Sequence, residues 1–238
     1  MIYEDVDIDI VDDDESESMT STHANTIDEK ILELDISDGP RKVLKILQEI
    51  SNTHAVEKVY LSRAFPSPRR AVATEEHVTQ VLESIVALPK IEHLSVGYAS
   101  GSFPIHLLMK ALADNDQRTR MEEQPTTSTI ASLVLLGVKL TSRETRAAAE
   151  TIRQGAIMSR LKTVSLENCK SDSSLRYSKH QRPLDVFVSA LASIASLESL
   201  SLKTIPAGSM HDIAHFPWLK ELQITHMTLS ETSLKNIG

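Results

Sequence analysis

The amino-acid sequence predicts an α/β solenoid, in which short parallel strands alternate with helices and stack on one another. One template, apolar-x-x-apolar-x-apolar, recurs seven times along the chain. Helix-forming segments separate the matches, and aromatic residues make up only 4% of the chain, which suits thin layers of small aliphatic side chains. The seven matches are Ile31-Leu34-Ile36, Val56-Val59-Leu61, Ile91-Leu94-Val96, Ile130-Leu133-Leu135, Leu161-Val164-Leu166, Leu197-Leu200-Leu202 and Leu219-Leu222-Ile224.

The template has the period of a half-buried strand. Its last two apolar residues alternate with polar residues, and its first turns in from the preceding loop. Central strands of a doubly wound sheet would read as continuous apolar runs, because both of their faces are covered. Such a fold also has no reason to repeat one template at every strand. The pattern therefore favours stacked repeats.

Helix-start signals precede the segments between the strands. Pro40 and Pro183 stand where a first helical residue is expected, since proline has no N–H to leave unpaired there. Thr74 is followed by two acids, which favour the positive end of a helix dipole. Thr141 and Glu144 have the spacing of a capping box. Helices are expected after each of these signals and after residue 102.

One of the seven matches extends beyond the three-residue template. Leu161, Val164, Leu166 and Cys169 have the spacing of a leucine-rich repeat, and the chain from about Ile31 onward resembles that family, nearest to its ribonuclease-inhibitor-like subclass. The resemblance implies a horseshoe with short parallel strands on its concave face and helices on its convex face. It also implies that Cys169 occupies the family's Asn/Cys position, where a side chain satisfies backbone groups as the chain leaves the strand.

The chain departs from the regular family pattern in two respects. The spacing between first template positions varies from 22 to 39 residues, and the Asn/Cys position is elsewhere filled by Val138, Ile205 or Met227. The excess residues fall in polar segments, 62–73, 114–129 and 171–182, which are predicted to be mobile surface loops. The repeat domain, residues 27–238, is thus expected to hold about seven irregular repeats.

The C-terminal end of the repeat domain shows no polar closing repeat. A further helix is expected to begin at Ser230, and the sequence stops at Gly238. Terminal repeats normally need a polar outer face. The chain is therefore expected either to be truncated at its C-terminus, as a fragment of a longer solenoid, or to have this end covered by a partner or a second copy.

Residues 1–26 have a different composition from the rest of the chain. They contain nine acidic residues and no Lys or Arg before residue 21, whereas the whole chain has a formal net charge of −8, which leaves the remainder near +1. This segment is predicted to be a disordered acidic tail. The near-neutral remainder has no basic stripe of the kind that nucleic acid or an anionic membrane would attract, so neither is expected as a partner.

The tail contains a short motif that resembles a SUMO-interacting motif. Ile8, Ile10 and Val11 form an apolar-x-apolar-apolar core directly before a run of acids. Such a core can add as a strand to an exposed sheet edge while the acids meet a basic patch. The alternatives are a solvated acidic tail with a few chance aliphatics, and a strand that pairs with the first edge of the solenoid itself.

In this architecture the residues between the template positions line the concave face. The predicted central row is Asp35, Tyr60, Ser95, Val134, Ser165, Ser201 and Gln223, and the next row is Ser37, Ser62, Gly97, Leu136, Glu167, Lys203 and Thr225. Large side chains are hypothesised to anchor a partner on this shallow polar surface. The alternative is that exposed positions simply tolerate variety. The candidate protein-binding residues are Tyr60, Arg63, His93, Tyr98, Val134, Leu136, Glu167, Lys203 and Gln223.

No constellation of catalytic, cofactor-binding or metal-binding residues stands out. His211 and His215 have the spacing of a zinc pair, but no Glu follows the first His and no third ligand is evident. Gly97 and Gly101 lie in a polar stretch typical of a turn and not of a phosphate-binding loop. Cys169 has no His placed near it by the repeat. The sequence thus predicts a protein that is not an enzyme.

Cysteine usage and hydropathy predict the compartment. Cys169 is the only cysteine, so no intramolecular disulfide can form, and a reducing compartment is expected. The acidic N-terminus differs from a signal peptide, and no apolar run approaches the length of about 20 residues that a membrane span needs. A cytoplasmic or nuclear protein is therefore expected.

The functional prediction is a non-enzymatic scaffold that binds a protein partner through its concave face. One alternative is a regulatory adaptor, whose tail recruits SUMO or another basic protein while the repeats bind a target. A second alternative is a regulator that resembles the GTPase-activating members of the family, although no residue of this chain can be assigned to that activity.

Overall fold

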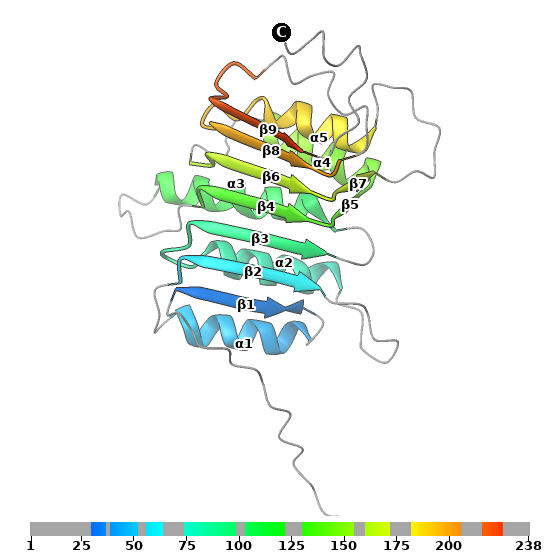
Figure 1. Cartoon of the computed structure of the whole chain (residues 1–238). Helices are drawn as coiled ribbons and strands as arrows, with labels where there is room; N and C mark the ends of the chain where they lie inside the picture. Colours follow the sequence, from blue (N-terminus) through cyan, green and yellow to red (C-terminus); the bar gives the residue numbers. More distant parts are fainter. Residues whose placement is uncertain are drawn as a thin grey trace, which may run out of the picture.

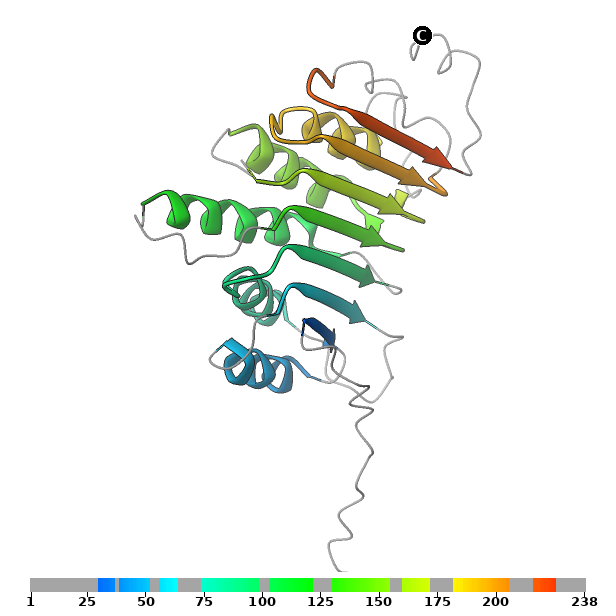
Figure 2. The ribbon, with the colours of Figure 1, turned by 60° about the vertical axis from the view of Figure 1, so that its left-hand side comes forward.

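The chain forms an α/β structure with one large parallel sheet. The computed structural model describes residues 30–36, 39–51, 56–63, 74–98, 103–121, 130–154, 160–171, 182–205 and 216–225. Within these ranges, seven strands form the sheet in the order β1-β2-β3-β4-β6-β8-β9, and each pairs in parallel with its neighbours. The five described helices lie on one face of this sheet (Figures 1 and 2).

Strands and helices alternate as the sequence predicts. The strands of the sheet are β1 (Ile31–Asp35), β2 (Lys58–Arg63), β3 (His93–Tyr98), β4 (Ser132–Leu136), β6 (Thr163–Glu167), β8 (Ser199–Lys203) and β9 (Glu221–Thr225). The helices are α1 (Pro40–Ser51), α2 (Glu75–Val86), α3 (Ile105–Met121), α4 (Ser142–Arg153) and α5 (Pro183–Leu191). Because successive strands are direct neighbours, each helix returns the chain to the next position along the sheet.

The last six template matches pair in the predicted register. Their strand residues form two continuous inward rows, so that aliphatic side chains meet at every step from β2 to β9. Side chains of these rows are almost fully buried in β2 through β8, whereas those of β9 are partly exposed. The rows are Val59, Leu94, Leu133, Val164, Leu200 and Leu222, and Leu61, Val96, Leu135, Leu166, Leu202 and Ile224.

The predicted frame of the first match is wrong by two residues. Leu34 of β1 pairs with Leu61 of β2. The template predicts instead that Leu34 lies opposite Val59. The apolar spacing fits both frames, because Ile36 is buried just beyond the end of the strand. As a result, Glu33 takes the place in the central outward row that the sequence assigned to Asp35.

Local capping explains where two helices begin. Thr74 precedes α2, and its hydroxyl accepts a hydrogen bond from the backbone N–H of His77. Thr141 precedes α4 and accepts one from the backbone N–H of Glu144 at 3.3 Å, as the capping-box spacing predicts. The side chain of Glu144, however, is bound by His106 of α3 and links two helices.

Helix α3 is longer than the sequence predicts. Residues 114–129 were expected to form a loop, yet α3 continues to Met121 and buries Asn115, Asp116 and Thr119. The hydroxyl of Thr119 donates to the backbone carbonyl of Asn115 at 2.9 Å, so its burial leaves no polar group unpaired. Polar composition therefore failed as a loop signal here, because a polar side chain such as Thr119 can bond to the backbone of its own helix.

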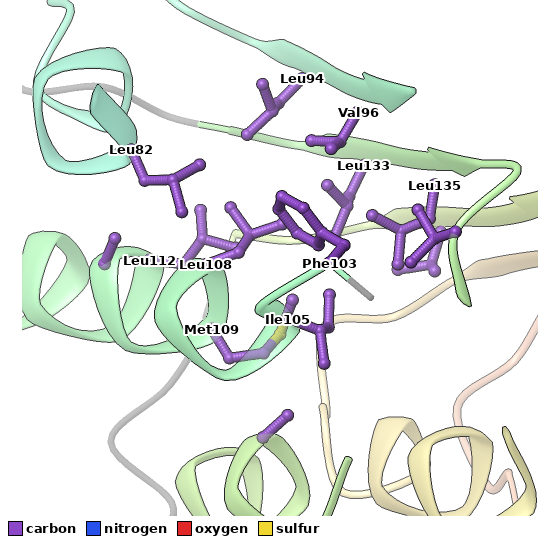
Figure 3. Packing of buried hydrophobic residues seen from close by; sticks show 14 of the residues in the cluster. Leu82, Leu94, Val96, Phe103, Ile105, Leu108, Met109, Leu112, Leu133 and Leu135 are labelled. Atoms are coloured by element: carbon purple, nitrogen blue, oxygen red, sulfur yellow. The ribbon is translucent and has the colours of Figure 1, made fainter. Parts of the chain in front are cut away.

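The core fills the space between the sheet and the helices. Figure 3 shows the region around the start of α3, where Phe103 packs beside the aliphatic side chains of β3 and β4. Phe103 is only 1% exposed, and it is one of the largest fully buried side chains. The neighbouring buried residues in this view are Leu82, Leu94, Val96, Ile105, Leu108, Met109, Leu112, Leu133 and Leu135.

The ladder continues beyond the ends of β4, β6 and β8. Gly137, Asn168 and Thr204 all have positive φ angles, of 67°, 51° and 52°, and stand at equivalent positions after these strands. Each donates its N–H to the carbonyl of the next strand, as Gly137 does to Glu167 at 2.8 Å. The same sharp bend thus recurs after three neighbouring strands of the sheet.

The residue after each bend points into the core. Val138 and Cys169 are 0% exposed, and Ile205 is 3% exposed. The thiol of Cys169 donates to the backbone carbonyl of Leu135 at 3.4 Å, which is the backbone-satisfying role that the sequence predicts for this position. Two short strands that the sequence did not predict, β5 (Lys139–Leu140) and β7 (Lys170–Ser171), then pair in parallel.

Several predictions lie outside the described residues. These are the disorder of residues 1–26, the parts of the predicted mobile loops at 64–73, 122–129 and 172–181, and the helix expected at Ser230. Within the described ranges, no helix is long and apolar enough to cross a membrane.

Candidate functional site

The face of the sheet opposite the helices is lined by outward side chains of all seven paired strands. We call it the open face, because no described helix covers it (Figure 2). Side chains alternate between the two faces of a strand, so every second residue points outward. The three outward rows are Ile31, Lys58, His93, Ser132, Thr163, Ser199 and Glu221; Glu33, Tyr60, Ser95, Val134, Ser165, Ser201 and Gln223; and Asp35, Ser62, Gly97, Leu136, Glu167, Lys203 and Thr225.

Aromatic and aliphatic side chains gather on β2, β3 and β4. We call Tyr60, His93, Val134 and Leu136 the anchor cluster. Tyr60 is 37% exposed and Leu136 is 47% exposed, although both are large and apolar. The rings of Tyr60 and His93 lie 5.9 Å apart between centroids and are tilted by 52°. Exposed apolar side chains grouped on one surface are typical of an interaction site.

The environment of His93 favours its neutral form. Partial burial lowers the pKa of His93 below its ordinary value of 6.5, and the positive charge of Lys58 lowers it further. Its Nδ1 atom lies 3.0 Å from the hydroxyl of Ser132 on β4. The imidazole is therefore held by a hydrogen bond and by the ring of Tyr60, and it adds a largely uncharged surface to the anchor cluster.

The other half of the open face is polar and internally paired. Lys203 Nζ donates to Glu167 Oε1 at 2.9 Å, and the hydroxyl of Ser165 donates to the same oxygen at 3.0 Å. The hydrogen bond from Lys203 is the main cause that lowers the pKa of Glu167. Ser201 donates to Gln223 at 3.1 Å. Groups that already satisfy one another gain less from a partner.

The structure divides the predicted site residues between these two halves. Tyr60, His93, Val134 and Leu136 lie on the neighbouring strands β2, β3 and β4. Glu167, Lys203 and Gln223 lie on β6, β8 and β9. Arg63 and Tyr98 pair in register at the ends of β2 and β3, but their side chains, like Ile8, Ile10 and Val11 of the tail, lie outside the described residues.

A second cluster, on the helix layer, was missed by sequence reasoning. Nε2 of His106 on α3 lies 3.4 Å from Glu75 Oε1 of α2, and Nδ1 of His106 binds Glu144 Oε2 of α4. The two carboxylates approach opposite nitrogens of one ring, so the cluster ties three helices together. No spacing in the sequence signals it, because the three residues come from different repeats.

The chemistry of the described residues gives no reason to assign a reaction. No group of three or more His, Cys, Asp or Glu side chains among them is arranged to hold a metal ion. Burial raises the pKa of the Cys169 thiol to about 11, which keeps it protonated and a poor nucleophile at neutral pH. His211 and His215 lie outside the described ranges.

Comparison with known proteins does not identify a family. No protein-family model matches the chain, and no curated protein matches its sequence.

Proposed function

We propose that the chain is an irregular leucine-rich-repeat solenoid that acts as a non-enzymatic scaffold for protein–protein interaction, with the open face as its recognition surface. Three features support the repeat architecture: one template per strand, strands paired in chain order, and described helices confined to one face of the sheet. In such a stack, each repeat buries its apolar side against its neighbours and leaves the opposite face of the strands for binding.

The exposed anchor cluster is the observation that carries this proposal. Most outward side chains of the sheet are small or polar, yet Tyr60 and Leu136 remain exposed in a chain that has few aromatic residues. Aromatic side chains surrounded by small polar ones are typical of interface hot spots. The hydrogen-bonded ladder holds them rigidly, which lowers the entropy lost when a partner binds.

The acidic tail supports a second candidate, a regulatory adaptor. The core of Ile8, Ile10 and Val11 beside its acids would recruit SUMO or another basic protein, while the open face binds a target. Both candidates would act in the cytoplasm or nucleus, since the one cysteine of the chain is a buried thiol.

Proximity labelling in cells tests the scaffold function. The full chain, fused to a labelling enzyme, is compared with Leu136→Asp, which places a charge in the anchor cluster, and with Arg146→Asp, an exposed change on α4 of the helix layer. We expect Leu136→Asp to remove a defined set of neighbours and Arg146→Asp to keep it. The proposal fails if both variants keep the same neighbours while both fold.

A further inference from the structure

We infer that a notch on strand β3, formed by Ser95 and Gly97, receives an apolar side chain of a partner segment whose nearby arginine pairs with Glu33. This inference rests on the proposed scaffold function and specifies the chemistry of the partner. It commits to an extended peptide segment that crosses the strands and carries one apolar and one basic side chain.

The notch arises because Ser95 and Gly97 are the smallest outward residues of β3 and adjoin larger ones. In the central row, Ser95 lies between Tyr60 of β2 and Val134 of β4. In the next row, Gly97 lies between Ser62 of β2 and Leu136 of β4. Since strands are about 4.8 Å apart, the side chains on β2 and β4 stand roughly 10 Å apart, which is room for one aliphatic or aromatic side chain between them.

The described residues leave the space at Gly97 open. A Cβ atom added to this residue would meet none of their heavy atoms within 4 Å, the two chain neighbours of the glycine aside. The backbone of Gly97 does not have a positive φ, so the fold does not require glycine there. A larger residue would be compatible with the strand, and the missing side chain leaves a depression beside Leu136.

Negative charge on strand β1 is the reason to expect a basic residue in the partner segment. Glu33 is exposed on β1 and is the direct cross-strand neighbour of Tyr60. Asp35 lies two residues further along the same strand and adds negative charge. Lys58 of β2 is a diagonal neighbour of Glu33 and offsets part of this charge. The outward surface of β1 is thus acidic and adjoins the anchor cluster.

The distance between the notch and Glu33 determines how far apart the apolar and the basic residue of the partner segment should be. The notch on β3 and Glu33 on β1 are two strand spacings apart, about 10 Å. An extended segment in the polyproline II conformation has three residues per turn and advances about 3.1 Å per residue, so side chains three positions apart point to the same side about 9 Å from each other. The basic residue should therefore stand about three positions from the apolar one. Arginine fits better than lysine, because its planar guanidinium can stack on Tyr60 and form a bidentate pair with Glu33.

Selection from a displayed library of random peptides on the full chain tests the inference. We expect enriched peptides to share an apolar residue and an arginine about three positions apart. Gly97→Leu, which fills the notch, should weaken their binding about tenfold or more. Thr225→Leu places the same leucine side chain in the same row on β9 and should leave binding unchanged, and thermal melting shows whether each variant folds.

The electrostatic part is tested by a double-mutant cycle. Glu33→Gln should weaken binding of a selected peptide about two- to fivefold, and this loss should vanish when the arginine of the peptide is replaced by glutamine. Lys58→Gln should strengthen binding of the same peptide. The absence of coupling between Glu33 and the arginine would overturn the assigned partner chemistry.

The outcomes separate this inference from the function on which it rests. If selected peptides lose binding on Leu136→Asp but tolerate Gly97→Leu and Glu33→Gln, the notch is refuted and the open face remains the binding surface. If no selected peptide responds to Leu136→Asp, the open face itself is refuted.

Discussion

Replacing one leucine on each face of β4 measures what the inward rows contribute to stability. Leu133 is fully buried and meets Leu94 and Val164 on the neighbouring strands, whereas Leu136, three residues along the same strand, is 47% exposed. We expect Leu133→Ala to lower the free energy of unfolding by about 3–4 kcal/mol, because a buried leucine loses both its transfer energy and its packing. Leu136→Ala should cost less than about 1 kcal/mol.

Urea denaturation followed by circular dichroism gives both values on the same chain. For a chain of this length, a loss of about 3 kcal/mol corresponds to a fall in melting temperature of roughly 10 °C. The two variants remove the same atoms from the same strand, so they differ only in the face that they change. Equal losses for Leu133→Ala and Leu136→Ala would refute the assignment of inward and outward rows.

Three further predictions come from the structure and one from the sequence of the acidic tail. Burial lowers the pKa of His93, so the unfolded chain binds more protons than the folded chain below pH 6.5. The stability of the folded chain should therefore fall as the pH drops from 6.5 through the lowered pKa of the folded state. His93→Gln should flatten this dependence in thermal melts recorded across the same pH range. An unchanged slope would contradict the assigned burial. Thr204 is β-branched and has a φ of 52°, so Thr204→Gly should raise the stability by about 1 kcal/mol, and a lower melting temperature would argue against strain at this bend. Cys169 should react with a thiol reagent only after unfolding, because burial raises its pKa to about 11; rapid reaction of the native chain would show that the site is open. A labelled peptide of residues 3–20 should bind SUMO saturably and lose binding when Ile10 and Val11 are changed to alanine, whereas a flat titration would remove the adaptor hypothesis.

The sequence predicts most of the sheet because each strand repeats the same inward pattern. Leu94, Leu133 and Val164 are found by their spacing alone, and the structure pairs them in adjacent strands. At β1 the same reasoning failed, since Leu34 and Ile36 fit two frames and only the pairing with β2 distinguishes them. Spacing thus locates the strands, but it does not fix the register of a strand whose apolar residues fit two frames.

The site depends on contacts that spacing does not reveal. The anchor cluster could be predicted, because its members lie between template residues on neighbouring strands. The internal pairing of Glu167 with Lys203 could not, since a side-chain hydrogen bond needs two rotamers to agree. The cluster of His106 with Glu75 and Glu144 joins three helices and depends on how they pack. The row neighbours of Gly97 could be predicted, but the open space beside it is known only from the structure.

Site-specific photo-crosslinking tests the central claim most directly. A photoreactive amino acid is placed at Leu136 on the open face or at Arg146 on α4, and the crosslinked proteins are identified in cells by mass spectrometry. If the open face is the recognition surface, a defined partner should crosslink at Leu136 and not at Arg146. Crosslinking of the partner only at Arg146, or of no protein at Leu136, would contradict a recognition role for this surface.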